Sequence, residues 1–270
     1  MKNQSLQITL SIFKIMIGIV GAGFVGSAVK NAYDTYNIPT IVRDPVKGFN
    51  ASWEDICDCT AVFVCVPSPS AENGEADTSI LEEVLDNIKS IKGVIISKVT
   101  APPTVYKNLQ AKYPNLVHAP EFLVALNANE DYINSTFSFI GGSRTYAQLA
   151  KEFIKLGQIH LKSIKYCSIE EASLAKYTIN SFLALKVSFM NQIYNLSKEV
   201  GADYNVLKEL LMDDERLGTS HFDVPGPDGK RGFGGACFPK DVKAITAVSK
   251  SLGVELKLLT DILQYNEKLR

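Results

Sequence analysis

The sequence lacks the features that mark disulfide-rich, membrane-spanning and nucleic-acid-binding proteins. Only five of its 270 residues are cysteines, and no Cys-x-x-Cys pair or Cys/His cluster appears, so neither a disulfide framework nor a zinc site is encoded. The longest uncharged apolar run, residues 15–29, is glycine-rich and shorter than the ~20 residues that span a bilayer. Lys+Arg 28 against Asp+Glu 29 leave no basic surplus for phosphate backbones. We therefore expect a soluble, cytoplasmic protein without a metal and without nucleic-acid or membrane partners.

The first fourteen residues are set apart from the rest. They carry basic and apolar residues but no small-residue cleavage site, so a signal peptide is a poor interpretation. We treat residues 1–14 as an N-terminal extension, with Met16 as a candidate internal start.

Short apolar runs alternate with helical stretches in the next part of the chain. The runs predict buried parallel strands, and the stretches between them predict helices at residues 27–36 and 79–90. The expected strands are residues 15–20, 40–42, 61–66 and 93–97. This alternation predicts an α/β fold, a doubly wound Rossmann-like domain over residues 15–168.

From residue 169 the pattern becomes purely helical. Residues 169–200 contain almost no turn residues and predict one long helix, of the kind that spans two domains or forms a dimer seam. Further helices are expected at residues 205–212, 239–252 and 256–270. We therefore expect a helical central and dimerisation domain over residues 169–270.

A glycine motif lies between the first strand and the first helix. Gly21, Gly23 and Gly26 enclose Phe24 and Val25 in the pattern Gly-x-Gly-x-x-Gly, which permits a tight turn and lets a pyrophosphate approach the helix start. Asp44 ends the second strand, where an acid binds the ribose hydroxyls of NAD. The neighbouring Arg43 leaves open a 2′-phosphate site for NADP, or a merely solvated side chain. NAD is the favoured cofactor.

Two further groups of residues carry chemistry. Cys237 follows two glycines and precedes Pro239 and Lys240, so a helix start and a cation would both stabilise its thiolate. Most single cysteines are instead buried structural residues. Lys176 and Asn180 are four residues apart and project from one helix face, where they would stabilise an oxyanion. On spacing alone, such a pair is more often a surface pair.

Several motifs in order carry a resemblance to the UDP-glucose/GDP-mannose 6-dehydrogenase family. Besides the glycine motif they are Val66-Pro67-Ser68-Pro69, Lys98-Val99-Thr100-Ala101-Pro102, Ala119-Pro120-Glu121-Phe122-Leu123, Lys176-x-x-x-Asn180 and the Gly-Gly-Ala-Cys-Phe-Pro-Lys-Asp block ending at Asp241. The resemblance implies a four-electron oxidation of a nucleotide-sugar C6 alcohol to the acid with two NAD, and UDP-glucose to UDP-glucuronate is the expected reaction. The resemblance also implies a homodimer joined through the long helix.

The resemblance implies a role for each matching residue. Cys237 is the nucleophile, Lys176 and Asn180 stabilise the oxyanion, and Asp241 and Thr100 handle water and protons. Glu121 assists proton movement and hydrolysis, although an N-cap of a short helix is the alternative for this residue. Ser68, Thr100 and Lys240 are expected beside the cofactor. The expected substrate contacts are Glu121, Phe122, Leu123, Lys176, Asn180, Arg216, Phe233, Gly234 and Gly235, with Arg216 passed to a neighbouring subunit's site.

Two departures from the family pattern stand out. Ala125 replaces a second acid that helps position cofactor and substrate. Family members usually continue into a third α/β domain that covers the substrate's nucleotide, whereas this sequence stops at Arg270. We therefore expect weak oxidation of UDP-glucose unless a separate polypeptide supplies that domain.

Two other functions remain open at this stage. A β-hydroxyacid-type dehydrogenase also pairs a Rossmann domain with Lys-x-x-x-Asn, but it makes a single hydride transfer and needs no cysteine. A non-catalytic NAD or nucleotide-sugar binding protein is the other alternative. The sugar, the base and a role for His221 do not follow from the sequence.

Overall fold

The computed structural model describes residues 15–124 and 127–270, which form two compact units. Unit 1 comprises the described residues up to Ser68 and residues 77–174, and unit 2 comprises residues 69–76 and 175–270. The division falls inside a helix, at Leu174. The domain boundary predicted after residue 168 stays a prediction, and the expected extension, residues 1–14, lies outside the described residues.

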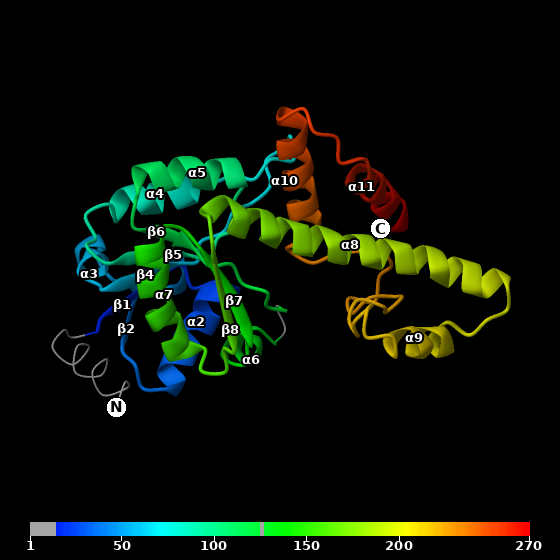
Figure 1. The fold of residues 1–270 in the computed structure, drawn as a ribbon, viewed down its shortest axis with the longest axis horizontal. Coiled ribbons are helices and arrows are strands. Elements are labelled where there is room, and N and C mark those ends of the chain that lie inside the picture. Colours follow the sequence, from blue (N-terminus) through cyan, green and yellow to red (C-terminus); the bar gives the residue numbers. More distant parts are fainter. Residues whose placement is uncertain (1–14, 125–126) are drawn as a thin grey trace. The chain divides into compact units, whose positions relative to one another are not determined.

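Unit 1 is built on an eight-stranded sheet with the strand order β3-β2-β1-β4-β5-β6-β7-β8 (Figure 1). The strands are β1 (Ile17–Val20), β2 (Thr40–Asp44), β3 (Phe49–Asn50), β4 (Ala61–Val64), β5 (Val94–Ser97), β6 (Leu116–His118), β7 (Phe137–Gly141) and β8 (Ser163–Cys167). The five strands from β2 to β6 in this order run parallel, β3 pairs antiparallel with β2, and β7 pairs antiparallel with β6. The strand order reverses at β1, between β2 and β4, which is where doubly wound sheets bind ligands.

Helices cover both faces of this sheet because its strands alternate their side chains. Ala61 and Phe63 of β4 pack on the face covered by α2, α6 and α7, whereas Val62 and Val64 pack on the face covered by α3, α4 and α5. These helices are α2 (Phe24–Thr35), α3 (Trp53–Cys57), α4 (Ser79–Asn87), α5 (Pro103–Lys112), α6 (Ala128–Ile133) and α7 (Arg144–Gly157), with a 3-10 turn η1 (Pro45–Lys47) after β2. The predicted doubly wound fold is confirmed.

A single long helix, α8 (Ile169–Glu199), leads from unit 1 into unit 2. It starts at a capping box, in which Ser168 Oγ accepts from the Glu171 backbone N–H at 3.1 Å and Glu171 accepts from the Ser168 N–H at 2.7 Å. Gly201, with φ +74, follows its end. The predicted helix over residues 169–200 therefore forms almost to the residue.

Unit 2 consists of α8 from residue 175 with α9 (Tyr204–Met212), α10 (Phe238–Ser251) and α11 (Lys257–Leu269), which matches the predicted helical part. Apolar side chains of α8, α10 and α11 pack around Phe233, which is 2% exposed. This core holds the segment leading to Cys237 between three helices.

Candidate functional site

The glycine motif forms the turn between β1 and α2. Gly21 has φ +90, and a Cβ there would come within 2.8 Å of the Cys65 carbonyl oxygen. A Cβ at Gly26 would overlap the Gly21 carbonyl, so α2 and the turn fit together only with glycine. A Cβ at Gly23 would meet no atom within 4 Å, which leaves the backbone face open. The sequence predicted this tight turn and an open approach to the helix start.

The start of α2 is suited to a pyrophosphate. Gly23 occupies the N-cap position and no side chain caps the helix there, so the first backbone N–H groups, including those of Phe24 and Val25, are left for a ligand. The Phe24 side chain is 66% exposed. An uncapped N-terminus at the switch point of the sheet fits the phosphates of a dinucleotide.

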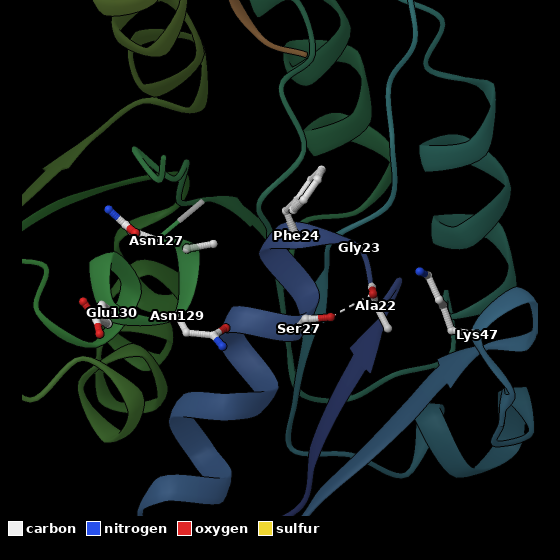
Figure 2. A pocket seen from close by; sticks show the side chains of 9 residues that line it. Ala22, Gly23, Phe24, Ser27, Lys47, Asn127, Asn129 and Glu130 are labelled. Carbon is white, nitrogen blue, oxygen red and sulfur yellow. Dashed lines mark hydrogen bonds between the residues drawn. The ribbon is translucent and has the colours of Figure 1, made fainter. Parts of the chain in front are cut away.

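A cavity of about 540 Å³ opens beside this turn (Figure 2). Figure 2 shows Lys47 on one side of the glycine turn and Asn129 and Glu130 of α6 on the other. Ser27 Oγ donates to the Ala22 carbonyl at 2.9 Å and so fixes the turn. The volume and the lining suit part of an extended dinucleotide.

Asp44 lies at the end of β2 beside the same turn. Its carboxylate accepts the Ala22 N–H at 2.7 Å and the Lys47 N–H at 3.3 Å. Arg43, one residue earlier, donates to the Ala51 carbonyl at 2.6 Å and its guanidinium lies 4.2 Å from the Trp53 ring centroid. The Asp44 carboxylate therefore lies against the glycine turn, whereas the Arg43 guanidinium contacts Ala51 and Trp53.

The carboxyl ends of β4 and β5 carry the next predicted residues. Ser68 is buried and its Oγ donates to the Thr100 carbonyl at 2.7 Å, so the two predicted cofactor-side residues lie together. Glu121 forms a buried ion pair with Lys98. The next described helix, α6, has Asn127 and not Glu121 at its N-cap position.

Lys98 belongs to one of the family motifs, but its ion pair with Glu121 was not predicted from the sequence. Its ammonium lies 5.8 Å and 5.6 Å from the ring centroids of Phe63 and Tyr132. Burial raises the pKa of the neighbouring Cys65 thiol to about 12, with Lys98 lowering and Glu121 raising it. The position of Lys98 directly after an apolar strand was the only sequence signal for its burial. Because lysine is rarely buried, that signal did not predict an ion pair in the core.

Phe122 and Leu123, which follow Glu121 among the predicted substrate contacts, are only partly buried. Phe122 packs its ring against Phe137 and Phe139, with centroids 5.3 and 5.4 Å apart. Leu123 packs against the core of unit 1. Ala125 lies outside the described residues.

In unit 2, Cys237 is exposed and occupies the N-cap position of α10. Pro239 lies in the first turn of the helix, as predicted, and the Cys237 carbonyl accepts the Asp241 N–H at 2.9 Å. The thiol therefore lies at a helix N-terminus and is open to solvent, as a nucleophile must be.

Three predicted polar residues gather next to this helix start. Asp241 is 1% exposed and accepts from Asn180 Nδ2 and from Lys240 Nζ, each at 2.5 Å. Lys176, one turn before Asn180 on α8, is also buried. Burial of Lys176, Asn180 and Asp241 shows that the Lys-x-x-x-Asn pair is no solvated surface pair.

The remaining predicted contacts lie around the loop before Cys237. Phe233 is a core residue, Gly234 is half-buried and Gly235 is exposed with φ +75. Arg216 is exposed and pairs with Asp214 at 2.5 Å. The role expected for Arg216, in a neighbouring subunit's site, stays a prediction.

His221, which had no predicted role, has φ +66 and packs its ring against Phe238, with centroids 5.5 Å apart. Burial, followed by the nearby Lys186 ammonium, lowers its pKa, which favours the neutral ring. Among residues 15–124 and 127–270, no group of three or more His, Cys, Asp or Glu side chains is placed to hold a metal ion. None of the helices in this part of the chain is both long and apolar enough to cross a membrane.

Two stretches match the domains of one protein family. Residues 40–156 match the NAD binding domain, and residues 170–268 the central domain, of the UDP-glucose/GDP-mannose dehydrogenase family. UDP-glucose 6-dehydrogenase from Rickettsia bellii (strain RML369-C) is 31% identical over 246 residues, which are 87% of this chain and 55% of that protein. The chain thus spans about half the length of such relatives.

Solved structures show the same architecture. A UDP-glucose dehydrogenase from the archaeon Pyrobaculum islandicum has a TM-score of 0.79 at 25% identity, covering 94% of this chain and 68% of that one. A 3-hydroxyisobutyrate dehydrogenase from Mycobacterium tuberculosis has a TM-score of 0.74 at 14% identity, covering 94% and 93%. The second likeness shows the fold alone, so fold does not separate the two dehydrogenase classes.

Proposed function

Because this chain belongs to the UDP-glucose/GDP-mannose dehydrogenase family, a family of NAD-dependent oxidoreductases, we propose that it oxidises the C6 alcohol of UDP-glucose to the acid. The observation that carries the proposal is Cys237, exposed at the start of α10 and followed one turn later by the buried Asp241. A single hydride transfer needs no such cysteine, so this arrangement favours the four-electron reaction.

NAD is the cofactor of this family's dinucleotide domain, and the residues of unit 1 fit it. Each of the two oxidations would transfer one hydride to one NAD, so two NAD are used for each acid formed. The uncapped start of α2 would hold the pyrophosphate, and Asp44 would accept hydrogen bonds from ribose hydroxyls. Ser68 and Thr100, held together by their hydrogen bond, would line the nicotinamide end.

The first oxidation removes a proton and a hydride from the C6 alcohol. The proton leaves through a water bound to Asp241, whose carboxylate is kept in place by Asn180 and Lys240. The Lys176 ammonium and the Asn180 amide share one face of α8 and would stabilise negative charge on the reacting oxygen.

The second oxidation is covalent. The Cys237 thiolate adds to the aldehyde carbon, and the resulting thiohemiacetal loses a hydride and its hydroxyl proton to become a thioester. Water then attacks the thioester carbon, the carbon–sulfur bond breaks, and Cys237 leaves as a thiol while the acid is released. Glu121, paired with Lys98, is the carboxylate proposed to accept the proton from that water.

We also propose that the enzyme is a homodimer joined through α8. Phe182, Phe189 and Leu196 recur every seven residues along α8, and their side chains are 63%, 56% and 57% exposed. An exposed apolar stripe with this spacing supports the proposed helix-pair seam. Arg216 is the proposed contribution of one protomer to its partner's site.

The test is NADH formation by the purified chain with NAD and a panel of nucleotide sugars. We expect oxidation of UDP-glucose in the wild type, no acid from Cys237→Ser, and unchanged turnover in Cys57→Ser as the matched control. Serine stays protonated, so it cannot replace the thiolate in the covalent step. Acid formation by Cys237→Ser at the wild-type rate, or no NADH with any nucleotide sugar, would contradict the proposal.

A further inference from the structure

Two buried asparagines form hydrogen bonds with consecutive residues of the loop that leads to Cys237. Asn191 on α8 is 1% exposed and its Oδ1 accepts from the Gly232 N–H at 3.3 Å and from Arg231 Nε at 3.1 Å. Asn266 on α11 is 8% exposed, and its Oδ1 accepts the Phe233 N–H at 2.7 Å. Its Nδ2 donates to the Phe233 carbonyl at 3.0 Å.

Asn266 forms hydrogen bonds with both backbone polar groups of Phe233. A side-chain amide that binds both the N–H and the C=O of Phe233 replaces the two hydrogen bonds that a neighbouring strand would make. The fit is close, since Gly232 has φ +72 and a Cβ there would overlap Asn266 Oδ1. Glycine before Phe233 is therefore required by the asparagine itself.

The segment between this contact and the nucleophile is short and rich in glycine. Gly234, Gly235 and Ala236 alone separate Phe233 from Cys237, and glycine loses more backbone freedom on ordering than any other residue. At its far end, α10 fixes the Cys237 carbonyl through the Asp241 N–H. The near end is fixed by Asn266, Asn191 and the burial of Phe233.

We propose that Asn266, supported by Asn191, is a positioning residue for Cys237: it anchors the near end of the glycine segment and so keeps the thiol exposed at the start of α10. Neither asparagine belongs to the proposed catalytic set. The catalytic meaning of this role rests on the proposed function of Cys237, but the anchoring itself does not.

The test compares Asn266→Leu with Gln264→Leu, which makes the same change at an exposed amide on the same helix. Amide hydrogen exchange of peptides containing Phe233, and alkylation of Cys237 by iodoacetamide followed by peptide mass, are measured on the full chain. In Asn266→Leu we expect exchange at Phe233 to be roughly tenfold faster, because the hydrogen bond that protects its N–H is lost. We expect alkylation of Cys237 to be severalfold slower, since the released segment no longer keeps the thiol exposed to solvent.

Asn191→Ala provides a second test that leaves α11 intact. It removes the Gly232 and Arg231 contacts, and we expect faster exchange at Gly232 with the same fall in alkylation. Where turnover is measured, we expect kcat per folded enzyme to fall while the KM for NAD stays unchanged. The folded fraction is measured by circular dichroism, because partial unfolding alone would also lower the rate at an unchanged KM. A folded variant with wild-type exchange and wild-type alkylation overturns the proposal, and does so even if the wild-type chain proves to have no dehydrogenase activity. Conversely, absent activity with the expected exchange and alkylation refutes only the proposed function.

Discussion

At the scale of single residues, the cysteines of this chain have sharply different environments. Cys237 is exposed at a helix start, whereas burial raises the pKa of Cys59 to about 11 and that of Cys65 to about 12. The thiolate is the reactive form of cysteine. Cys237 is accessible to reagents, whereas Cys59 and Cys65 are buried and stay protonated, so Cys237 is the most reactive of these three cysteines.

We therefore expect iodoacetamide at about pH 8 to label Cys237 well before Cys59 and Cys65. The raised pKa values keep the two buried thiols protonated at that pH, and their burial excludes the reagent. Peptide mapping against time gives the order of labelling. Labelling of Cys65 as early as Cys237 would show that the core of unit 1 opens readily or that the thiol is not buried.

Asp44 makes a second residue-scale prediction. Asp44→Ala removes the carboxylate proposed for the ribose hydroxyls and should weaken NAD binding by ~1–2 kcal/mol. Arg43→Ala is the matched control and should change NAD affinity little, since that side chain contacts Ala51 and Trp53. Calorimetric titration with NAD and NADP measures both. A protein that prefers NADP and loses that preference in Arg43→Ala would show that the cofactor assignment is wrong.

At the scale of elements, the sequence predicted what is local and missed what is not. Apolar runs predicted β1, β4 and β5, and the turn-free stretch predicted α8, because burial on two faces and helical continuity leave direct patterns. Strand β7 pairs antiparallel with β6 through a single residue pair, His118 and Gly141. No local sequence pattern predicts this pairing. The ion pair of Lys98 and Glu121 likewise joins the ends of two neighbouring strands, β5 and β6, that a helix separates in the sequence.

That ion pair predicts a large effect on stability. Lys98→Met removes a buried ammonium from a buried carboxylate, which costs ~3–5 kcal/mol when one partner of such a pair is lost. Lys112→Met is the matched control, since Lys112 pairs with Asp86 in solvent and its loss should leave stability nearly unchanged. The free energy of unfolding of both variants is measured by urea titration. Equal midpoints would mean that the Lys98 pair contributes no more than a surface pair.

At the scale of the whole molecule, the exposed apolar stripe on α8 predicts assembly. Phe189→Glu places a charge in the middle of the stripe and should convert the proposed dimer to a monomer. Leu258→Glu, on α11 and 67% exposed, is the control and should leave the assembly unchanged. Sedimentation velocity reports the mass of each variant. A wild-type monomer, or a Phe189→Glu dimer, would contradict a seam on α8.

The most direct test of the central claim is the ratio of NADH formed to acid produced from UDP-glucose. A four-electron oxidation through Cys237 requires two hydride transfers for each acid, so the account predicts two NADH per UDP-glucuronate in the wild type and no acid in Cys237→Ser. One NADH per oxidised sugar, with the aldehyde or a ketone as the final product, would contradict it.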